Sequence, residues 1–339
     1  MKWPSESAEP RYESKIQSAH GGRPRIRTES PLWAPLRGEF PYLPQDLAPS
    51  IATDEVPFLA ARYDELDLSF DAAAATIWCF MRPKGPPSFT PSLLRELIAM
   101  RRSLQASFTN PAAVRPRYFV GGSRLPHIFN LGGDLAYFAE TIRTGNRDAL
   151  TRYAHDCVDV GYHMAIGFDL PVITIALVQG DALGGGFEGA LSFNVLVAEK
   201  SAKFGLPEIL FNMFPGMGAY SFLSRRLDAA RAERMILSGR IYSASELHDM
   251  GLIDVLADDG CGEAAVKDHI ARNNRVHAAH RSVRDVRHRI NPLSLEELKD
   301  VADIWADHAL QLEETDLRRM ERLTAAQNRR VAAQPAAGL

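Results

Sequence analysis

Residues 175–194 read IALVQGDALGGGFEGALSFN, and this stretch decides the fold that we expect. Its first residues continue an almost unbroken apolar run, which is typical of a buried strand. Gly184, Gly185 and Gly186 follow, and Glu188 then stands just inside a predicted helix. Glycine is costly unless the backbone must come close to another group. Unpaired N–H groups at a helix start, together with the helix dipole, form a site for an anion or an oxyanion.

A second carboxylate, Glu208, follows in FGLPE, which we interpret as a loop that returns to the glycine turn. Two carboxylates beside an oxyanion site suit proton removal next to a carbonyl and proton delivery to a leaving group. Taken alone, Glu188 is more simply explained as a partner of the helix dipole, and Glu208 as a surface residue. Their joint context favours catalysis.

The glycines also match a dinucleotide-binding pattern. Gly184, Gly186 and Gly189 fit GxGxxG, and Glu208 lies at the distance expected of a ribose-binding acid. However, QGDAL separates the strand from the glycines, and Pro207 would disrupt a second central strand. We therefore disfavour a dinucleotide-binding site, and the absence of GxxxxGK[ST] disfavours a P-loop. The chain also lacks the GxSxG pattern of serine hydrolases.

Bulk composition narrows the class of protein. The chain has 339 residues, of which 46% are hydrophobic and 24% charged, with a net charge of −3. A near-balanced charge argues against a nucleic-acid binder. Cys79, Cys157 and Cys261 lie far apart, and His155 and His163 lack metal-site spacing, so we expect free thiols, no metal and no cofactor.

Hydrophobic runs give an expectation about the compartment. We find no apolar run long enough to span a bilayer and no apolar segment near residue 1 of the kind that signal peptides carry. The sequence therefore predicts a soluble cytoplasmic protein with no membrane span.

Strand and helix patterns alternate along most of the chain, which predicts an α/β fold. Residues 1–53 are rich in proline and predict an extended or partly disordered arm. The expected strands and helices then follow in alternation: two strands with a turn in 60–81, a helix over 90–107 capped by Thr90, a strand in 115–122, a loop and helix in 129–143, a helix over 152–168, a strand in 171–180, and a strand then a loop in 194–208. From about residue 265 the tail is charged and helical in pattern.

Four segments together resemble one family. GGGFE, FGLPE, FPGMG and the upstream FNLGGDL are similar to the crotonase, or enoyl-CoA hydratase/isomerase, superfamily. The likeness covers residues 54–255 and implies a spiral of ββα units, with 256–339 as a helical C-terminal region used for trimerisation. More narrowly, FNLGGDLAYF and KFGLPEILFNMFPGMGAYSFLSRR resemble the diffusible-signal-factor synthases, which make cis-2-unsaturated fatty acid signals.

The resemblance implies roles for particular residues. Glu188 and Glu208 match the two catalytic glutamates, and the N–H groups of Leu131 and Gly185 match the oxyanion hole. Ala219 and Tyr220 replace the glycine and threonine that the family usually has, which suggests an altered acyl tunnel or altered carrier handling. Further residues would contact the substrate or line an acyl pocket: Gly132, Gly184, Phe187, Leu210, Met213, Phe214, Pro215, Gly216, Met217 and Phe222.

The resemblance also implies substrates and partners. The substrate would be an acyl-carrier-protein or CoA thioester, the assembly a homotrimer or dimer of trimers, and a sensor kinase a possible regulator. Arg225, Arg226 and residues 280–289 could receive an acidic carrier protein, although a solvated helix face is the simpler interpretation. The alternatives are an ordinary enoyl-CoA hydratase of fatty-acid oxidation and a non-catalytic binding protein on the same scaffold.

Overall fold

The structure is a computed structural model, and it describes residues 61–110 and 113–332. These residues all belong to one unit, which spans 48–339. The predicted N-terminal arm over 1–53 lies outside the described residues, and the division at 53 and 255 stays a prediction.

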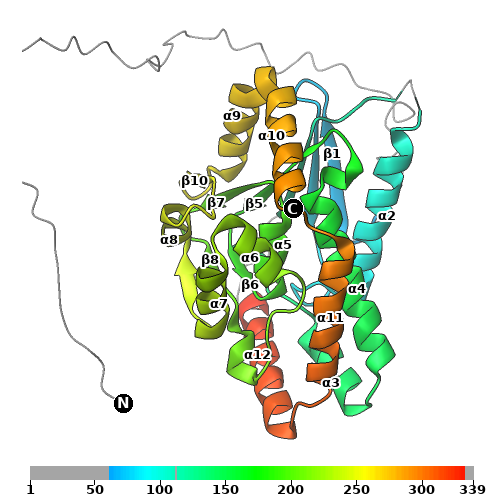
Figure 1. The fold of residues 1–339 in the computed structure, drawn as a ribbon, viewed down its shortest axis with the longest axis vertical. Helices are drawn as coiled ribbons and strands as arrows, with labels where there is room; N and C mark the ends of the chain where they lie inside the picture. Colours follow the sequence, from blue (N-terminus) through cyan, green and yellow to red (C-terminus); the bar gives the residue numbers. More distant parts are fainter. Residues whose placement is uncertain (1–60, 111–112, 333–339) are drawn as a thin grey trace, which may run out of the picture. The chain divides into compact units, whose positions relative to one another are not determined.

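Strands and helices alternate through the first two thirds of the described chain, and helices follow (Figure 1). The strands are β1 (Leu66–Asp71), β2 (Thr76–Met81), β3 (Tyr118–Ser123), β4 (Ile128–Asn130), β5 (Ile173–Val178), β6 (Asp181–Leu183), β7 (Val195–Glu199), β8 (Lys203–Gly205), β9 (Ile241–Ser243) and β10 (Val255–Ala257). The α-helices are α2 (Pro91–Ser107), α3 (Leu135–Arg143), α4 (Arg147–Ala165), α5 (Gly185–Ser192), α6 (Ala219–Arg226), α7 (Ala229–Ser238), α8 (Ala244–Asp249), α9 (Gly262–Asn273), α10 (His277–Ile290), α11 (Leu295–Ala309) and α12 (Glu314–Ala332). Short 3₁₀ turns are η3 (Gly167–Asp169), η4 (Pro207–Phe211) and η5 (Asn274–Val276).

The larger sheet has the order β1-β2-β3-β5-β7-β10, and only β1 and β2 pair antiparallel. Every residue of β2 is buried, because successive side chains point to opposite covered faces. Ile77 and Cys79 join the core beneath α2, α4 and α5, whereas Trp78 and Phe80 join a second cluster with α9. The sheet is therefore covered by helices on both faces, as the predicted α/β class requires.

A smaller sheet of order β4-β6-β8-β9 positions the candidate site. Strands β4, β6 and β8 are parallel, with Asn130 beside Ala182 and Leu183 beside Gly205. The segments that leave these three strands therefore emerge at one edge, where ligands usually bind in parallel sheets. They carry FNLGGD, GGGFE and FGLPE, which brings the three predicted motifs together.

Most predicted elements are confirmed, and one predicted loop is corrected. The Thr90 side chain caps α2 by accepting the Leu93 N–H, with Pro91 in the first turn as predicted. We predicted a loop for 200–208, but it contains strand β8 and the 3₁₀ turn η4. Pro207 is tolerated in η4 because it stands at the start, where its missing N–H is not needed.

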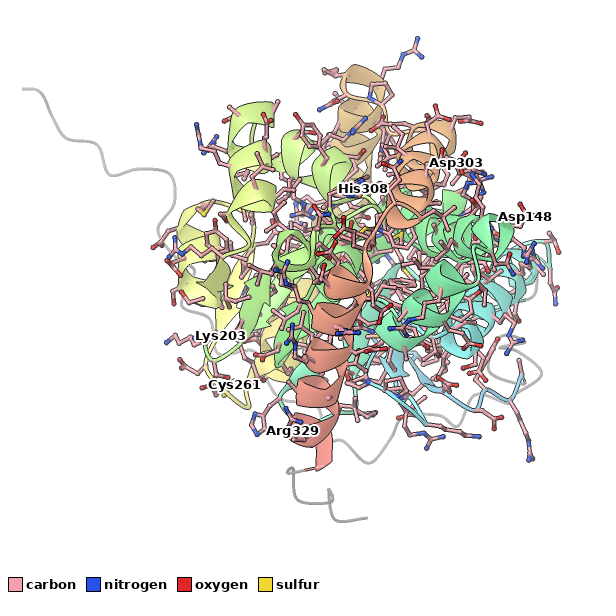
Figure 2. The ribbon with its side chains drawn as sticks, turned by 90° about the horizontal axis from the view of Figure 1, so that it is seen from below. Asp148, Lys203, Cys261, Asp303, His308 and Arg329 are labelled. Carbon is pink, nitrogen blue, oxygen red and sulfur yellow. The ribbon has the colours of Figure 1, made fainter. Side chains whose placement is uncertain are left out.

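The predicted helical tail is confirmed and packs on the α/β core. Helix α11 lies beside α4, where Asp303 pairs with His155 at 2.9 Å, and α12 lies beside α3 (Figures 1 and 2). The Arg143 side chain joins α3 to α12 through Glu314 and Glu321. His163, the other histidine of α4, contacts Arg101 and the Asp159 carbonyl. Trimerisation through this region stays a prediction.

Two further expectations concern the described residues only. The three cysteines are free, with Cys79 buried and Cys261 exposed. No helix between residues 61 and 332, apart from the undescribed 111–112, is long and apolar enough to cross a membrane.

Candidate active site

The glycine turn is the point at which the three motifs touch. A methyl group at Gly184, where φ is +54°, would lie 2.8 Å from Oε1 of Glu208. A methyl group at Gly186 would lie 2.0 Å from the Asn130 carbonyl oxygen. We predicted that these glycines make room for a ligand, but two of them are required by the protein's own carboxylate and carbonyl.

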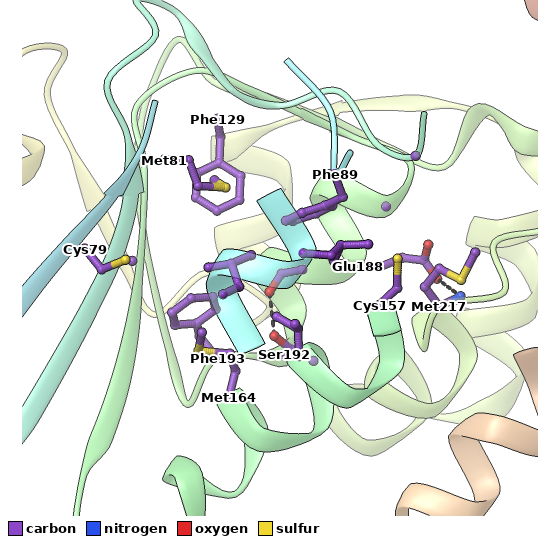
Figure 3. Close-up of a pocket in the computed structure, with 18 of the residues that line it drawn as sticks. Cys79, Met81, Phe89, Phe129, Cys157, Met164, Glu188, Ser192, Phe193 and Met217 are labelled. Atoms are coloured by element: carbon purple, nitrogen blue, oxygen red, sulfur yellow. Dashed lines mark hydrogen bonds between the residues drawn. The ribbon is translucent and has the colours of Figure 1, made fainter. Parts of the chain in front are cut away.

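Glu188 is a buried carboxylate held by main-chain donors. It lies in the first turn of α5 and is 3% exposed. Its Oε1 accepts the N–H groups of Met217 at 2.8 Å and Ala219 at 2.9 Å (Figure 3). Burial raises the pKa of Glu188 to about 7, although these two hydrogen bonds favour the ionised form. Because Ala219 contributes its main-chain N–H, its side-chain difference from the family leaves this contact intact.

Glu208 faces the same pocket from η4, but it has fewer partners. Its Oε2 is buried and has no hydrogen-bond partner among the described residues. Burial, followed by repulsion from Glu188, raises the pKa of Glu208 well above its ordinary value. The two carboxyls titrate as a coupled pair, so one of them stays protonated near neutral pH. The proton favours Glu208, because Glu188 accepts two main-chain N–H groups from other residues, whereas Glu208 has only its own main-chain N–H to stabilise its charge.

The structure contradicts the predicted role of Leu131. Its N–H donates to the Pro87 carbonyl at 2.7 Å, so it is not available to a substrate oxygen. The N–H of Gly132 donates to the Asn130 side chain at 2.8 Å. The next residue, Gly133, has its nitrogen 3.4 Å from where a methyl group on Gly185 would lie.

Gly133 therefore replaces Leu131 as the candidate partner of Gly185. Within 61–110 and 113–332, neither glycine N–H donates to a main-chain carbonyl of a turn, loop or cap. The second glycine of NLGGD could have indicated Gly133 as an oxyanion donor. The sequence does not show, however, which N–H of that loop is already bonded to Pro87.

An outer pocket of about 300 Å³ contains both glutamates. Its walls come from the three motif loops, α3, α11 and α12. Nearly all of the predicted substrate-contacting residues line it: Gly132, Gly184, Leu210, Met213, Phe214, Pro215, Gly216 and Met217. Helix α12 contributes Met320 and Leu323, which the sequence did not single out.

An inner cavity of about 70 Å³ lies on the other side of Glu188 (Figure 3). Most of its lining is apolar and comes from strands β2 and β3 and helices α2 and α4, including Met81, Leu97, Phe119 and Met164. The two spaces share Gly133, Gly185, Glu188 and Met217. Sequence reasoning missed this cavity, because its walls come from elements far apart in the chain.

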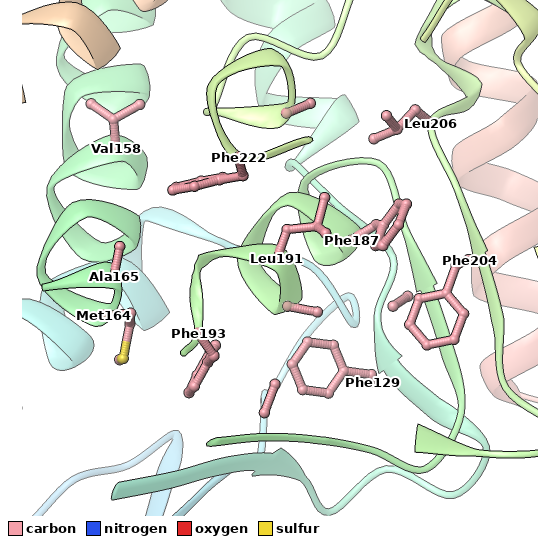
Figure 4. Packing of buried hydrophobic residues seen from close by; sticks show 14 of the residues in the cluster. Phe129, Val158, Met164, Ala165, Phe187, Leu191, Phe193, Phe204, Leu206 and Phe222 are labelled. Atoms are coloured by element: carbon pink, nitrogen blue, oxygen red, sulfur yellow. The ribbon is translucent and has the colours of Figure 1, made fainter. Parts of the chain in front are cut away.

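Two predicted pocket residues belong to the core instead. Phe187 is fully buried, and its ring meets that of Phe204 at 5.3 Å between centroids (Figure 4). Phe222 is 5% exposed and packs in the same core. Neither lines the outer pocket or the inner cavity. Helix α5 turns Phe187 away from Glu188, since adjacent helical residues point in different directions.

The predicted carrier-docking arginines are used inside the protein. Arg225 forms an ion pair with Glu297 at 2.7 Å and also donates to the Pro292 carbonyl. Arg226 donates to the carbonyls of Phe193 and Leu252. These bonds cap main-chain oxygens and hold α6 in place, so neither guanidinium is free for a partner, and neither lies on a solvated face.

The two sheets bring both glutamates, Gly133 and Gly185 to one pocket. The chain belongs to the enoyl-CoA hydratase/isomerase family, whose sequence profile matches residues 77–321.

Several known proteins are similar to this chain. A probable enoyl-CoA hydratase of Mycobacterium leprae is 38% identical over 155 residues, which cover 44% of this chain and 56% of that protein. A putative polyketide biosynthesis enoyl-CoA hydratase of Bacillus subtilis has a similar solved structure, with a TM-score of 0.62 at 18% identity over 78% of this chain and 99% of that one. The solved structure of DspI from Pseudomonas aeruginosa has a TM-score of 0.56 at 22% identity, and the match covers 68% of this chain and 89% of that one. The two structures show the fold alone, and the match spans only about half of the M. leprae protein's length.

Proposed function

We propose that this protein removes or adds water at the α,β-carbons of an acyl thioester, and that its product is a cis-2-unsaturated fatty acid signal. One observation carries the proposal: two glutamates with raised pKa values face one pocket beside the N–H groups of Gly133 and Gly185. The motif resemblance to the diffusible-signal-factor synthases supports the narrower activity.

The proposed chemistry begins with the thioester oxygen. It accepts the two glycine N–H groups, which stabilise the enolate that forms when an α-proton leaves. Glu208 takes the proton from the α-carbon, and the C–O bond at the β-carbon breaks. Glu188 gives its proton to the departing hydroxyl, so one water leaves and a 2-enoyl thioester remains. Ionised Glu188 then takes a proton from a water that attacks the thioester carbonyl at the same site, and the C–S bond breaks. Glu208 gives its proton to the carrier thiolate as it leaves, so the products are the free acid and the carrier thiol.

The direction of reaction depends on which glutamate holds the shared proton. Dehydration by these roles needs the proton on Glu188, whereas the free site favours Glu208. Hydration needs ionised Glu188 to activate water and protonated Glu208 to give a proton to the α-carbon. This is the protonation state that the free site favours. This observation, with the names of the curated relatives, supports the second candidate, an enoyl-CoA hydratase of fatty-acid oxidation.

The two adjoining spaces suit a long acyl thioester. The inner cavity, with its apolar walls, would hold the alkyl chain, and the outer pocket would hold the thioester and the pantetheine arm of the carrier. The methionines that line both spaces adapt to a flexible chain. Carrier protein in place of CoA, a trimeric assembly, a cytoplasmic location and a sensor-kinase regulator are further parts of this proposal.

The experiment is a product analysis. The purified protein is incubated with 3-hydroxydodecanoyl thioesters of acyl carrier protein and of CoA, and the products are identified by mass spectrometry and NMR. A free cis-2-enoic acid supports the signal synthase. A trans-2-enoyl thioester without free acid supports the hydratase. No conversion of either thioester, or of the corresponding enoyl thioesters, would contradict both and favour a non-catalytic scaffold.

A further inference from the structure

Tyr153 is a buried tyrosine whose hydroxyl touches the loop that carries Gly133. It lies on α4, is 3% exposed and reaches the loop from the side of the inner cavity. Its Oη donates to the Phe89 carbonyl at 2.5 Å and accepts the Asp134 N–H at 3.3 Å. A methyl group on Gly133 would lie 3.4 Å from this oxygen.

The loop is bonded on one side to the segment around Phe89. The Leu131 N–H donates to the Pro87 carbonyl at 2.7 Å, and the Phe89 N–H donates to the Gly132 carbonyl at 2.8 Å. These bonds form a short parallel bridge between Phe89 and Gly133. Tyr153 lies at the open end of this bridge, where it occupies the Phe89 carbonyl and the Asp134 N–H.

The consequence concerns the orientation of one N–H group. The peptide that contains the Gly133 N–H is anchored at its Gly132 carbonyl by Phe89, and the next peptide is anchored at its Asp134 N–H by Tyr153. Glycine has no side chain to restrict its own rotation, so the anchors must fix its direction. An oxyanion donor works only when it already points at the developing charge.

We propose that Tyr153 is a positioning residue, which holds the Gly133 N–H toward the thioester oxygen through its two hydrogen bonds. This inference rests on the proposed function. It adds a residue that acts through the Gly133 loop and not by direct contact with the two glutamates or the reacting atoms.

The test compares two tyrosines of one aromatic cluster. Tyr153→Phe removes a single oxygen and keeps the ring in place, so the fold is retained, which thermal melting verifies. Tyr137→Phe is the matched control, because its ring lies 5.6 Å from that of Tyr153 while its hydroxyl donates to the Ala149 carbonyl at 3.4 Å, away from the Gly133 loop. For each protein we would measure kcat and KM for a 2-enoyl thioester. We would also measure Kd for a saturated acyl thioester and for the thioether that lacks its carbonyl oxygen.

For Tyr153→Phe we expect kcat to fall by about 10- to 100-fold, with little change in KM. This fall is no larger than the fall in kcat that follows removal of a whole oxyanion donor. Its preference for the thioester over the thioether should also shrink, whereas Tyr137→Phe should match the wild type in both respects.

Three other results would overturn the inference. Wild-type kcat and preference in Tyr153→Phe would show that the hydroxyl does not position the loop. Equal weakening of thioester and thioether binding would show that Tyr153 only shapes the cavity. A wild-type protein without any preference for the thioester would remove the oxyanion hole itself, and the proposed function would fail with it.

Discussion

The two loops that meet at the candidate site are held in different ways. The Gly184–Glu188 turn is fixed by near neighbours, since the Phe187 and Glu188 N–H groups both return to the Gly184 carbonyl within the start of α5. The loop from Asn130 to Asp134 is fixed by Pro87, Phe89 and Tyr153, which come from distant parts of the chain. The turn also has long-range bonds, from the Gly184 N–H to the Gly205 carbonyl and from Met217 to the Glu188 carboxylate. Local bonds thus set the direction of the turn, whereas long-range bonds alone set that of the second loop.

This difference shows where a sequence motif is sufficient. The GGGFE motif contains its own anchors, so its residues alone indicate which N–H is free. The NLGGD motif has three candidate N–H groups in a row, and only the bonds from residue 87 and the Asn130 side chain select among them. Substitutions in each half should therefore differ in the size and the kind of their effects.

The largest effect should come from the locally anchored half. Glu188→Gln keeps the shape of the side chain but removes the acid–base group, so kcat should fall by about 10²–10⁴-fold. Glu199→Gln is a matched control, because Glu199 is equally buried but binds Gln179 and Gly262 away from the pocket. Steady-state kinetics on both variants decide the matter, and wild-type kcat in Glu188→Gln would remove Glu188 from the mechanism.

The same carboxyl should make the protein less stable as pH rises. Its pKa is raised from 4.5 to about 7 in the folded protein, so the folded state holds more protons than the unfolded state between these values. The free energy of unfolding therefore falls from about pH 4.5 to 7, by at most about 3 kcal/mol.

Thermal melting across this pH range tests that sign. Glu188→Gln should lessen the fall but not abolish it, because the pKa of Glu208 is also raised by burial. Glu140→Gln, at an exposed position of α3, should leave the fall unchanged. A fall of equal size in both variants would assign it to other groups.

The contact between the two halves can be broken at Gly186. Gly186→Ala places a methyl group 2.0 Å from the Asn130 carbonyl, so the loops must move apart, at a cost of about 1–3 kcal/mol in the free energy of unfolding. Gly85→Ala is the control, because its methyl group meets nothing within 4 Å. Urea unfolding of both variants measures the difference, and equal stability would show that the loops do not touch as described.

The smallest effect should come from the anchor within the second loop. Asn130→Ala removes the acceptor of the Gly132 N–H, at a cost of about 1 kcal/mol in stability, and lets the loop shift. A shift of about 1 Å in a catalytic group can lower the rate by about 100-fold. Because the other anchors of the loop remain, the Gly133 N–H should move by less than this, and kcat should fall by less than about 100-fold. A larger loss than that of Glu188→Gln would reverse the order of the two halves.

Much of the fold was readable from the sequence, for a physical reason. Strands such as β5 and helices such as α2 and α4 follow from hydrophobic period and capping, which are local properties. The three-residue strands β4 and β8 were missed, because so short an element is defined by its partners rather than its own residues.

The site shows the same limit. Glu188, Glu208 and Gly185 could be named from their motifs, and the structure brings them together. Gly133 in place of Leu131, the inward direction of Phe187 and the internal use of Arg226 all depend on contacts with distant segments. Tyr153 carried no local signal, since a tyrosine on an amphipathic helix is ordinarily a core residue.

The position of Glu188 between two spaces has a consequence for how a substrate would be measured. A chain that reaches the inner cavity must thread past Gly133, Gly185 and Met217 with its methyl end leading. Under the proposed function the thioester would stop at the glycine N–H groups, so the position of the reacting carbons would be set from the carrier end of the acyl chain and not from its methyl end. This arrangement would keep carbons 2 and 3 at the reacting position for acyl chains of different length, while the depth of the inner cavity would limit the longest chain that binds.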